Sequence, residues 1–147
     1  MYKILLIFFF IYFSQSISFS NENNYFLMLK DKKVNVRYGP SLDYPIKFTY
    51  KKKFLPVKVI DKKDNFRKII DHKKNSGWIH RILLKKYNSL LVLEEKIVFK
   101  KNSKFSEPIV KLGKGRLVIV KKCVSDWCKI AADKYIGWIQ TNNVWGN

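Results

Sequence analysis

The chain has 147 residues and a composition typical of a folded protein, with 47% hydrophobic and 16% aromatic residues. This apolar content excludes wholesale disorder. The formal net charge is +19, but lysine supplies 26 of the 30 basic residues, and these are spread along the whole chain. Such a spread favours a generally solvated lysine surface over a nucleic-acid-binding stripe. The alternative is a diffuse, salt-sensitive attraction to an anionic envelope surface, made of lipid headgroups or cell-wall polymers.

Residues 1–20 form a separate apolar segment. Lys3 is its only charge, and an unbroken apolar run from Ile4 to Phe13 ends in a polar Ser-Gln-Ser. Ten residues rise only about 15 Å as a helix, which is too short for the roughly 30 Å hydrocarbon core of a membrane. The layout predicts a helical signal peptide, cleaved after Ser18 or after Ser20. An uncleaved N-terminal anchor is the alternative.

Both alternatives place the folded region outside the cytoplasm, in the periplasm or cell envelope. We therefore expect no DNA or RNA partner, and the sequence contains no glycine-rich phosphate-binding motif. Nucleotide motifs are likewise missing from the sequence, and we expect no cofactor.

The two cysteines, Cys123 and Cys128, are separated by four residues. This spacing suits a hairpin turn that places them opposite each other on adjacent strands. In an oxidising compartment the arrangement favours a disulfide bond, which contributes about 2 kcal/mol by closing a short loop. A zinc site is a weaker alternative, because it needs more ligands than the cysteines and two histidines at unmatched spacings. A catalytic thiol would need a free cysteine beside a base.

The region after residue 24 contains two copies of one pattern, residues 25–87 and 88–147. The copies align at an offset of 63 that shrinks to 61 and then to 60. The matched landmarks are Arg37 with Lys100, Pro45-Ile46 with Pro108-Ile109, Asn65–Ile69 with Asp126–Ile130, and Gly77–His80 with Gly137–Gln140.

The same alignment places the cysteines on charged residues of the first copy. At the offset of 61, Cys123 aligns with Lys62 and Cys128 aligns with Arg67. Because charged side chains occupy both positions in the first copy, we expect both cysteines to face solvent, joined by a surface bridge between strands.

Each copy has the pattern of short β-strands. Val34 and Val36 alternate with polar residues before the turn-forming Gly39-Pro40-Ser41, and Asp64-Asn65 is a further turn signal. No segment after residue 20 keeps a helical period. Five or so short strands in about 60 residues predict an all-β fold of two small closed or half-open barrels.

The segment Val34–Ile46 resembles the opening motif of bacterial SH3 domains, with its Arg-Tyr-Gly-Pro-Ser core. The segment Gly77–His80 resembles the closing strand of that family. The second copy keeps the Gly-Trp-Ile strand and the Asp-Trp turn but lacks the Arg-x-Gly-Pro-Ser core. The resemblance implies two tandem SH3-like β-barrels used for adhesion or targeting, commonly to cell-wall peptides or envelope proteins.

In SH3-like barrels a long loop after the first strands flanks a shallow groove. The resemblance therefore implies ligand contacts from Tyr38, Asp43 and Tyr44 in this loop, together with Trp78. Aromatic side chains supply a large contact area at a small entropic cost. Because Trp138 recurs at the place of Trp78, the alternative is that both tryptophans belong to the core.

Phe66 and Trp127 follow the turn signals of the two central hairpins. We expect both as exposed anchors at the hairpin tips and include them in the candidate binding set. His80 is expected as a structural residue, with a pH-sensitive contact as the alternative.

These features predict an exported, non-enzymatic binding module that recognises peptidoglycan peptides or an exported envelope protein. Two domains leave no residues for a catalytic domain, and the carboxylates are scattered with no pairing suited to acid–base chemistry. An alternative is a structural protein in which both domains form one rigid unit, because the junction Lys85–Asn88 leaves little slack. A third interpretation is electrostatic association with anionic lipid.

Overall fold

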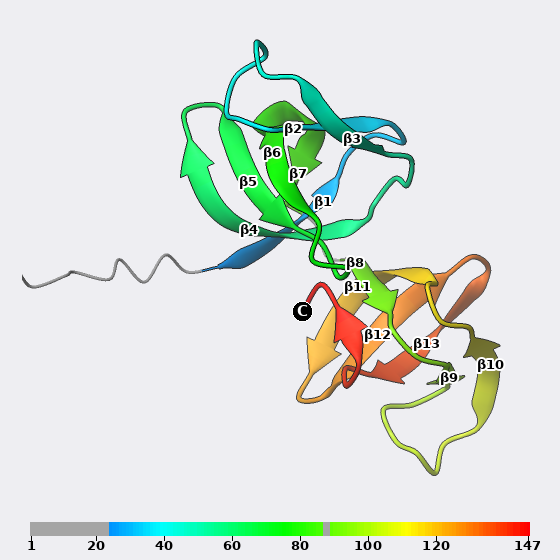
Figure 1. The fold of residues 1–147 in the computed structure, drawn as a ribbon. Helices are drawn as coiled ribbons and strands as arrows, with labels where there is room; N and C mark the ends of the chain where they lie inside the picture. Colours follow the sequence, from blue (N-terminus) through cyan, green and yellow to red (C-terminus); the bar gives the residue numbers. More distant parts are fainter. Residues whose placement is uncertain (1–23, 87–88) are drawn as a thin grey trace, which may run out of the picture.

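The computed structural model describes residues 24–86 and 89–147. Within these ranges the protein is all-β with one short 3₁₀ helix, as the sequence predicts (Figure 1). The predicted signal peptide helix, residues 1–20, lies outside the described residues. Among the described residues, no helix has the length and apolar character needed to cross a membrane.

The first sheet has seven antiparallel strands in the order β3-β2-β6-β5-β4-β1-β7. The strands are β1 (Tyr25–Leu29), β2 (Val34–Arg37), β3 (Ile46–Tyr50), β4 (Pro56–Lys63), β5 (Phe66–Ile70), β6 (Ser76–His80) and β7 (Leu84–Lys85). The 3₁₀ helix η2 (Arg81–Leu83) connects the last two.

The second sheet also has seven antiparallel strands, in the order β10-β9-β13-β12-β11-β8-β14. The strands are β8 (Ser89–Val92), β9 (Lys96–Phe99), β10 (Pro108–Leu112), β11 (Leu117–Val124), β12 (Trp127–Ala132), β13 (Tyr135–Gln140) and β14 (Val144–Trp145). The limits proposed for the two copies meet at residues 87 and 88, which lie outside the described residues and stay a prediction.

The matching strand order of the two sheets confirms the internal repeat. The hydrogen-bonded ladder of the first sheet runs from β3 to β7, and that of the second runs from β10 to β14. Each sheet is therefore open rather than a closed barrel, because the two-residue strands β7 and β14 pair only with β1 and β8. Figure 1 shows both sheets strongly curled.

Strand pairing corrects the sequence alignment by one residue where β2 and β9 are compared. Arg37 lies opposite Trp78, and Phe99 lies opposite Trp138. Arg37 is therefore equivalent to Phe99 and not to Lys100, and the neighbouring proline landmark shifts in the same way. The ladder decides the alignment, because a slip of one residue would turn every side chain to the opposite face.

Each sheet encloses an apolar core, because alternate residues of its strands face inward. In β2 the inward residues are Val34 and Val36, and in β6 Ile79 is fully buried. The first core also includes Leu91, which belongs to the second sheet. The second core contains Leu90, Val92, Val98, Leu112, Val118, Val120, Cys128, Ile130, Ala132 and Ile139.

Strand β2 passes very close to β6 at Gly77. A Cβ atom at this position would collide with the side chain of Val36 and lie 2.9 Å from the carbonyl oxygen of Arg37. Gly137 is crowded in the same way by β9. The glycine of each Gly-Trp-Ile segment is therefore required by the close packing of two strands.

The two sheets contact each other through several side chains. The hydroxyl of Ser89 donates a hydrogen bond to the carbonyl oxygen of Phe54 at 2.7 Å. The ring of Phe26 meets the ring of Trp145 edge to face, with centroids 5.2 Å apart. Apolar and polar contacts thus join the domains directly, in addition to the connecting chain.

Candidate functional site

The loop between β2 and β3, residues 38–45, is fixed by hydrogen bonds at its base. The backbone N–H of Tyr38 donates to the carbonyl oxygen of Pro45 at 3.2 Å, and Arg37 Nη1 donates to the carbonyl oxygen of Tyr44 at 2.7 Å. At the tip, the hydroxyl of Ser41 donates to Asp43 Oδ2 at 2.9 Å. Arg37 therefore holds the end of the loop through a backbone carbonyl group.

Two tyrosines of this loop are presented to solvent. The side chain of Tyr38 is 62% exposed and that of Tyr44 is 47% exposed. The Tyr44 ring lies against Gly39, where a Cβ atom would come within 2.5 Å of three ring carbons. The Lys47 ammonium lies 5.5 Å from the centre of the Tyr38 ring and donates to the carbonyl oxygen of Ser76. Each ring is therefore in contact with a neighbouring residue, Gly39 for Tyr44 and Lys47 for Tyr38.

Trp78 lies beside this loop on the outer face of β6. Its neighbours in the strand, Gly77 and Ile79, are buried, whereas Trp78 is half-buried and lies outside the first core. Directly paired residues of antiparallel strands point to the same face, so Trp78 shares a face with Arg37. The structure thus places Trp78 opposite Arg37 where β2 ends and the loop begins, and Arg37 in turn holds the carbonyl oxygen of Tyr44. The alternative that Trp78 is a core residue is wrong.

Asp43 belongs to the same loop but serves mainly the loop itself. Its carboxylate accepts the Ser41 hydroxyl, and its backbone N–H donates back to Ser41 Oγ at 3.2 Å. The residue is exposed to solvent at the loop tip. Asp43 therefore adds a negative charge beside the two tyrosines.

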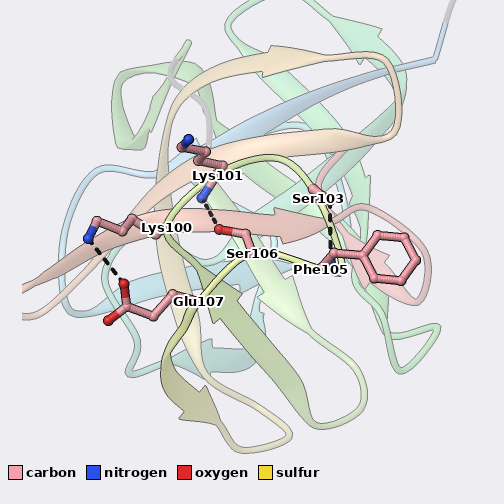
Figure 2. Close-up of a pocket in the computed structure, with 6 residues that line it drawn as sticks. All are labelled: Lys100, Lys101, Ser103, Phe105, Ser106 and Glu107. Carbon is pink, nitrogen blue, oxygen red and sulfur yellow. Dashed lines mark hydrogen bonds and ion pairs between the residues drawn. The ribbon is translucent and has the colours of Figure 1, made fainter.

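The equivalent loop of the second domain, residues 100–107, presents a different surface (Figure 2). Phe105 is fully exposed. It is equivalent to Asp43, because the backbone N–H of each residue donates to a serine hydroxyl two residues earlier. Lys100 pairs with Glu107 at 3.1 Å. These residues border a shallow hollow of about 510 Å³. Sequence reasoning missed Phe105, although an isolated aromatic residue in a polar turn was a usable signal.

The prediction that Phe66 and Trp127 are exposed anchors at the hairpin tips is wrong, because both side chains are buried. Phe66 is 6% exposed and packs edge to face on His80, and Trp127 is 8% exposed and packs on Phe99. Phe66 packs on the residue that it pairs with on β6, whereas Trp127 packs on Phe99 of β9, the strand beyond β13. His80 Nδ1 accepts a hydrogen bond from the first turn of η2, which favours a structural role.

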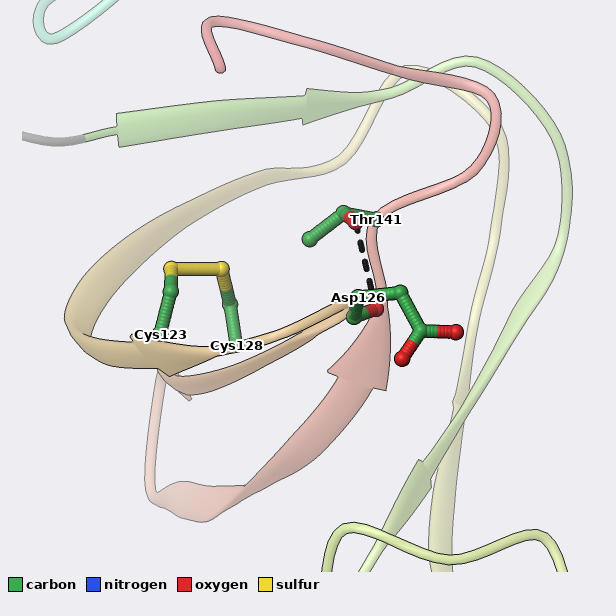
Figure 3. Close-up of a disulfide and its surroundings, with 4 residues drawn as sticks. All are labelled: Cys123, Asp126, Cys128 and Thr141. Atoms are coloured by element: carbon green, nitrogen blue, oxygen red, sulfur yellow. Dashed lines mark hydrogen bonds between the residues drawn. A yellow bond between two sulfur atoms is a disulfide. The ribbon is translucent and has the colours of Figure 1, made fainter.

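The predicted disulfide bond joins Cys123 to Cys128 across the β11–β12 hairpin (Figure 3). Its solvent exposure differs from the prediction. Cys123 is exposed, but Cys128 is fully buried and belongs to the second core. The difference arises because Cys128 occupies the inward face of β12, where the equivalent Arg67 is half-buried and turns its guanidinium back to the carbonyl oxygens of the hairpin.

A buried carboxylate, Asp71, organises the turn between β5 and β6. Its Oδ1 atom accepts from the backbone N–H groups of Lys73 and Asn75 at 2.8 and 2.9 Å. Its Oδ2 atom accepts from the hydroxyl of Tyr50 at 3.0 Å. Burial, reinforced by the charge of Asp71, raises the pKa of Tyr50 well above its ordinary value. The cluster holds a turn, and its acceptors are already occupied.

A second polar cluster lies at the start of β9. Lys96 is 8% exposed, and its ammonium donates to Glu94 at 2.7 Å and to Asn142 at 3.0 Å. Hydrogen bonds from Lys96 and then Asn143 lower the pKa of Glu94. Among the described residues, no group of three His, Cys, Asp or Glu side chains is arranged to hold a metal ion. Both polar clusters are explained by local structure.

Of three comparisons with known proteins, one identifies the family of the chain. Among solved structures, the chain is similar to NlpC2 and NlpC1 from Trichomonas vaginalis, with 14% identity to each and TM-scores of 0.38 and 0.39. The alignments cover 85% and 90% of this chain, which spans about half the length of those structures, 49% in each case. No curated protein matches the sequence. The model of the bacterial SH3 domain matches residues 30–86 and 95–146. The chain therefore belongs to the bacterial SH3 domain family and contains two tandem domains of it.

Proposed function

We propose that the protein is an exported, non-enzymatic binding protein whose first domain recognises a cell-wall peptide or an envelope protein. The observation that carries the proposal is the ordered β2–β3 loop, which holds Tyr38 and Tyr44 exposed to solvent. Two exposed aromatic side chains on an ordered loop supply a contact area at a small entropic cost. Bacterial SH3 domains are binding modules, and this chain has two of them.

The loop offers complementary chemistry for a peptide. Its aromatic rings provide apolar faces, their hydroxyls can orient a backbone, and Asp43 provides a carboxylate at the loop tip. An amino group or a protonated amine of a peptide ligand would pair with this carboxylate. The Lys47 ammonium, which already lies over the Tyr38 ring, would receive a ligand carboxylate.

The export part of the proposal rests on residues 1–20 of the sequence. A short apolar run between a lysine and small residues is the layout of a secretory signal. The mature protein would begin after Ser18 or Ser20 and act in the periplasm or cell envelope. Mass measurement of the N-terminus from the exported fraction tests this, and a full-length chain retained in the cytoplasm would contradict it.

Retention on purified peptidoglycan tests the binding site. We expect Tyr38→Ala and Tyr44→Ala each to lower retention about tenfold, because each removes a well-placed aromatic contact. Tyr25→Ala is the matched control, since Tyr25 is 44% exposed on β1 outside the loop. Retention should survive about 0.5 M salt, where charges are screened beyond about 4 Å. Release of the protein by modest salt, with no effect of either loop substitution on retention, would overturn the proposed binding site at the β2–β3 loop.

A second candidate function is a structural one, in which the two domains act as a single rigid unit. It is favoured by Leu91, which is buried in the core of the other domain, and by the Phe26–Trp145 ring contact. Separate expression of the two domains tests it. If each half is folded and monodisperse alone, the rigid-unit function is wrong.

A further inference from the structure

Positive charge is concentrated in the first domain. Residues 25–87 contain 18 Lys and Arg against 5 Asp and Glu, whereas residues 88–147 contain 11 against 5. All four ion pairs of the described residues lie in the second domain. Within the described residues, ion pairs are formed by none of the first-domain lysines Lys30, Lys32, Lys33, Lys51, Lys52 and Lys53.

Two lysine-rich turns of this domain lie side by side. The first turn contains Lys30, Lys32 and Lys33, and the second contains Lys51, Lys52 and Lys53; together we name these six residues the basic edge. Val34 pairs with Tyr50 across the β2–β3 ladder, so the next residues, Lys33 and Lys51, are neighbours. Figure 1 shows the β1–β2 and β3–β4 connections on one side of the first domain.

Backbone hydrogen bonds fix the two turns to each other. The N–H of Phe54 donates to the carbonyl oxygen of Leu29 at 3.0 Å, and the N–H of Leu29 donates to the carbonyl oxygen of Leu55 at 3.0 Å. The second domain extends the same surface, because Lys52 Nζ donates to the carbonyl oxygen of Gly115 at 2.9 Å. Gly115 is flanked by Lys114 and Arg116 in the sequence, although Arg116 is paired with Asp133.

The charge of the basic edge is almost entirely uncompensated. Asp31 is the one acidic residue in these two turns. Lys30, Lys32, Lys33 and Lys51 are exposed, and none of them forms an ion pair within the described residues. Because charges closer than the Debye length of about 10 Å reinforce one another, folding joins two separate lysine-rich runs of the sequence into one local field.

The basic edge lacks the features of a membrane-inserting surface. The aromatic residue that follows it in the sequence, Phe54, is covered by the ammonium groups of Lys53 and Lys85, at 5.0 and 5.1 Å from the ring centre. None of the exposed large apolar side chains belongs to residues 30–33, 51–55 or 113–116. Peripheral membrane surfaces ordinarily add apolar anchors to basic residues. Binding of a soluble, flexible polyanion requires only the positive charges of the lysines and no apolar anchor.

We propose that the basic edge is a second binding site, for a phosphate-bearing chain polymer, separate from the aromatic loop. The two surfaces lie at opposite ends of β2, since one turn precedes Val34 and the loop follows Arg37. A polymer with a charge at every unit can engage several lysines at once, which compensates for the weak contact made by each. The proposal does not depend on the peptide site.

The test measures binding of long-chain inorganic polyphosphate to the whole exported chain and to two variants of equal charge. The first carries Lys30→Gln, Lys32→Gln, Lys33→Gln and Lys51→Gln. The control carries Lys62→Gln, Lys63→Gln, Lys101→Gln and Lys121→Gln, four exposed lysines outside the basic edge. We expect the first variant to lose about tenfold or more in affinity and the control to lose about twofold or less. Unfolding curves check that both variants are folded.

Each outcome decides the proposal. Equal losses in both variants would show that only net charge matters, and the site would be wrong. Binding to phosphatidylcholine vesicles that contain phosphatidylglycerol, with none to polyphosphate, would replace the polymer with a membrane and also overturn it. The four basic-edge substitutions leave Tyr38 and Tyr44 in place, so peptidoglycan retention that depends on these tyrosines should persist. The two proposals can thus fail independently.

Discussion

The indole N–H of Trp145 donates a hydrogen bond to the carbonyl oxygen of Pro56, 89 residues earlier in the chain, at 3.0 Å. The donor lies on the last strand of the second domain, and the acceptor begins β4 of the first domain. The same indole meets Phe26 edge to face. One side chain on the last strand of the second domain therefore ties it to the first domain, so the stabilities of the two domains should be coupled.

Trp145→Ala should uncouple the two domains. The substitution removes an aromatic contact and a hydrogen bond at a half-buried position, and we expect a loss of about 2–3 kcal/mol in the free energy of unfolding. The native protein should unfold in urea in one transition, whereas the variant should show two. Circular dichroism and tryptophan fluorescence measured on the same samples would resolve the transitions.

Trp138→Ala is the matched control, because Trp138 is also half-buried but lies on the outer face of β13 over Lys122. This variant should retain a single transition. A single transition in both variants would mean that the coupling runs through other contacts, and separate transitions in the native protein would mean that there is none.

Reduction of the disulfide bond should destabilise the second domain. A bridge between residues five apart removes little chain entropy, so the expected loss is about 2 kcal/mol. Urea unfolding with and without dithiothreitol measures it. A Cys123→Ala, Cys128→Val variant should lose about the same stability and no longer respond to the reductant. Two free thiols in the untreated protein would contradict the prediction.

The hairpin register could be predicted from the sequence because the turn signals are specific. The offset of 61 aligned Lys62 with Cys123 and Arg67 with Cys128, and the structure pairs Lys62 with Arg67 as it pairs Cys123 with Cys128. Both hairpins also shift register at the equivalent place, after Val59 and after Val120. A short turn dictates which residues face each other, so local signals were sufficient here.

Features that depend on tertiary packing could not be predicted in this way. The burial of Phe66 depends on His80, a residue of another strand. The alignment of the β2–β3 loop was wrong by one residue, because loop landmarks do not record which strand lies opposite, whereas Phe99 and Trp138 do. The basic edge likewise arises only when two turns are brought together by the backbone of Leu29.

Gly77→Ala should destabilise the first domain by about 1–3 kcal/mol. A methyl group there would be forced against Val36 and the backbone of β2, and neither can withdraw without disturbing the core. Gly113→Ala is the matched control, since a Cβ atom at Gly113 would meet nothing within 4 Å. Thermal unfolding of both variants measures the difference. Equal stabilities would mean that β2 does not pass as close to β6 as the structure has it.

The hydroxyl of Tyr50 should make the stability of the first domain fall at alkaline pH. Burial first, and the neighbouring Asp71 second, raise the pKa of Tyr50 above the ordinary 10.0. The phenol therefore stays protonated in the native state while it ionises in the unfolded state, so its contribution is complete below pH 10 and declines as the pH rises further. Urea unfolding at about pH 8 and about pH 11 measures this decline.

Tyr50→Phe separates this contribution from the deprotonation of the many lysines, which both proteins share. The variant should lose about 1 kcal/mol at neutral pH, because one hydrogen bond to Asp71 is removed while the backbone N–H donors remain. It should then lose less stability than the native protein between about pH 8 and about pH 11. Parallel declines in the two proteins would mean that the native phenol ionises as readily as in the unfolded chain, and would contradict the raised pKa of Tyr50.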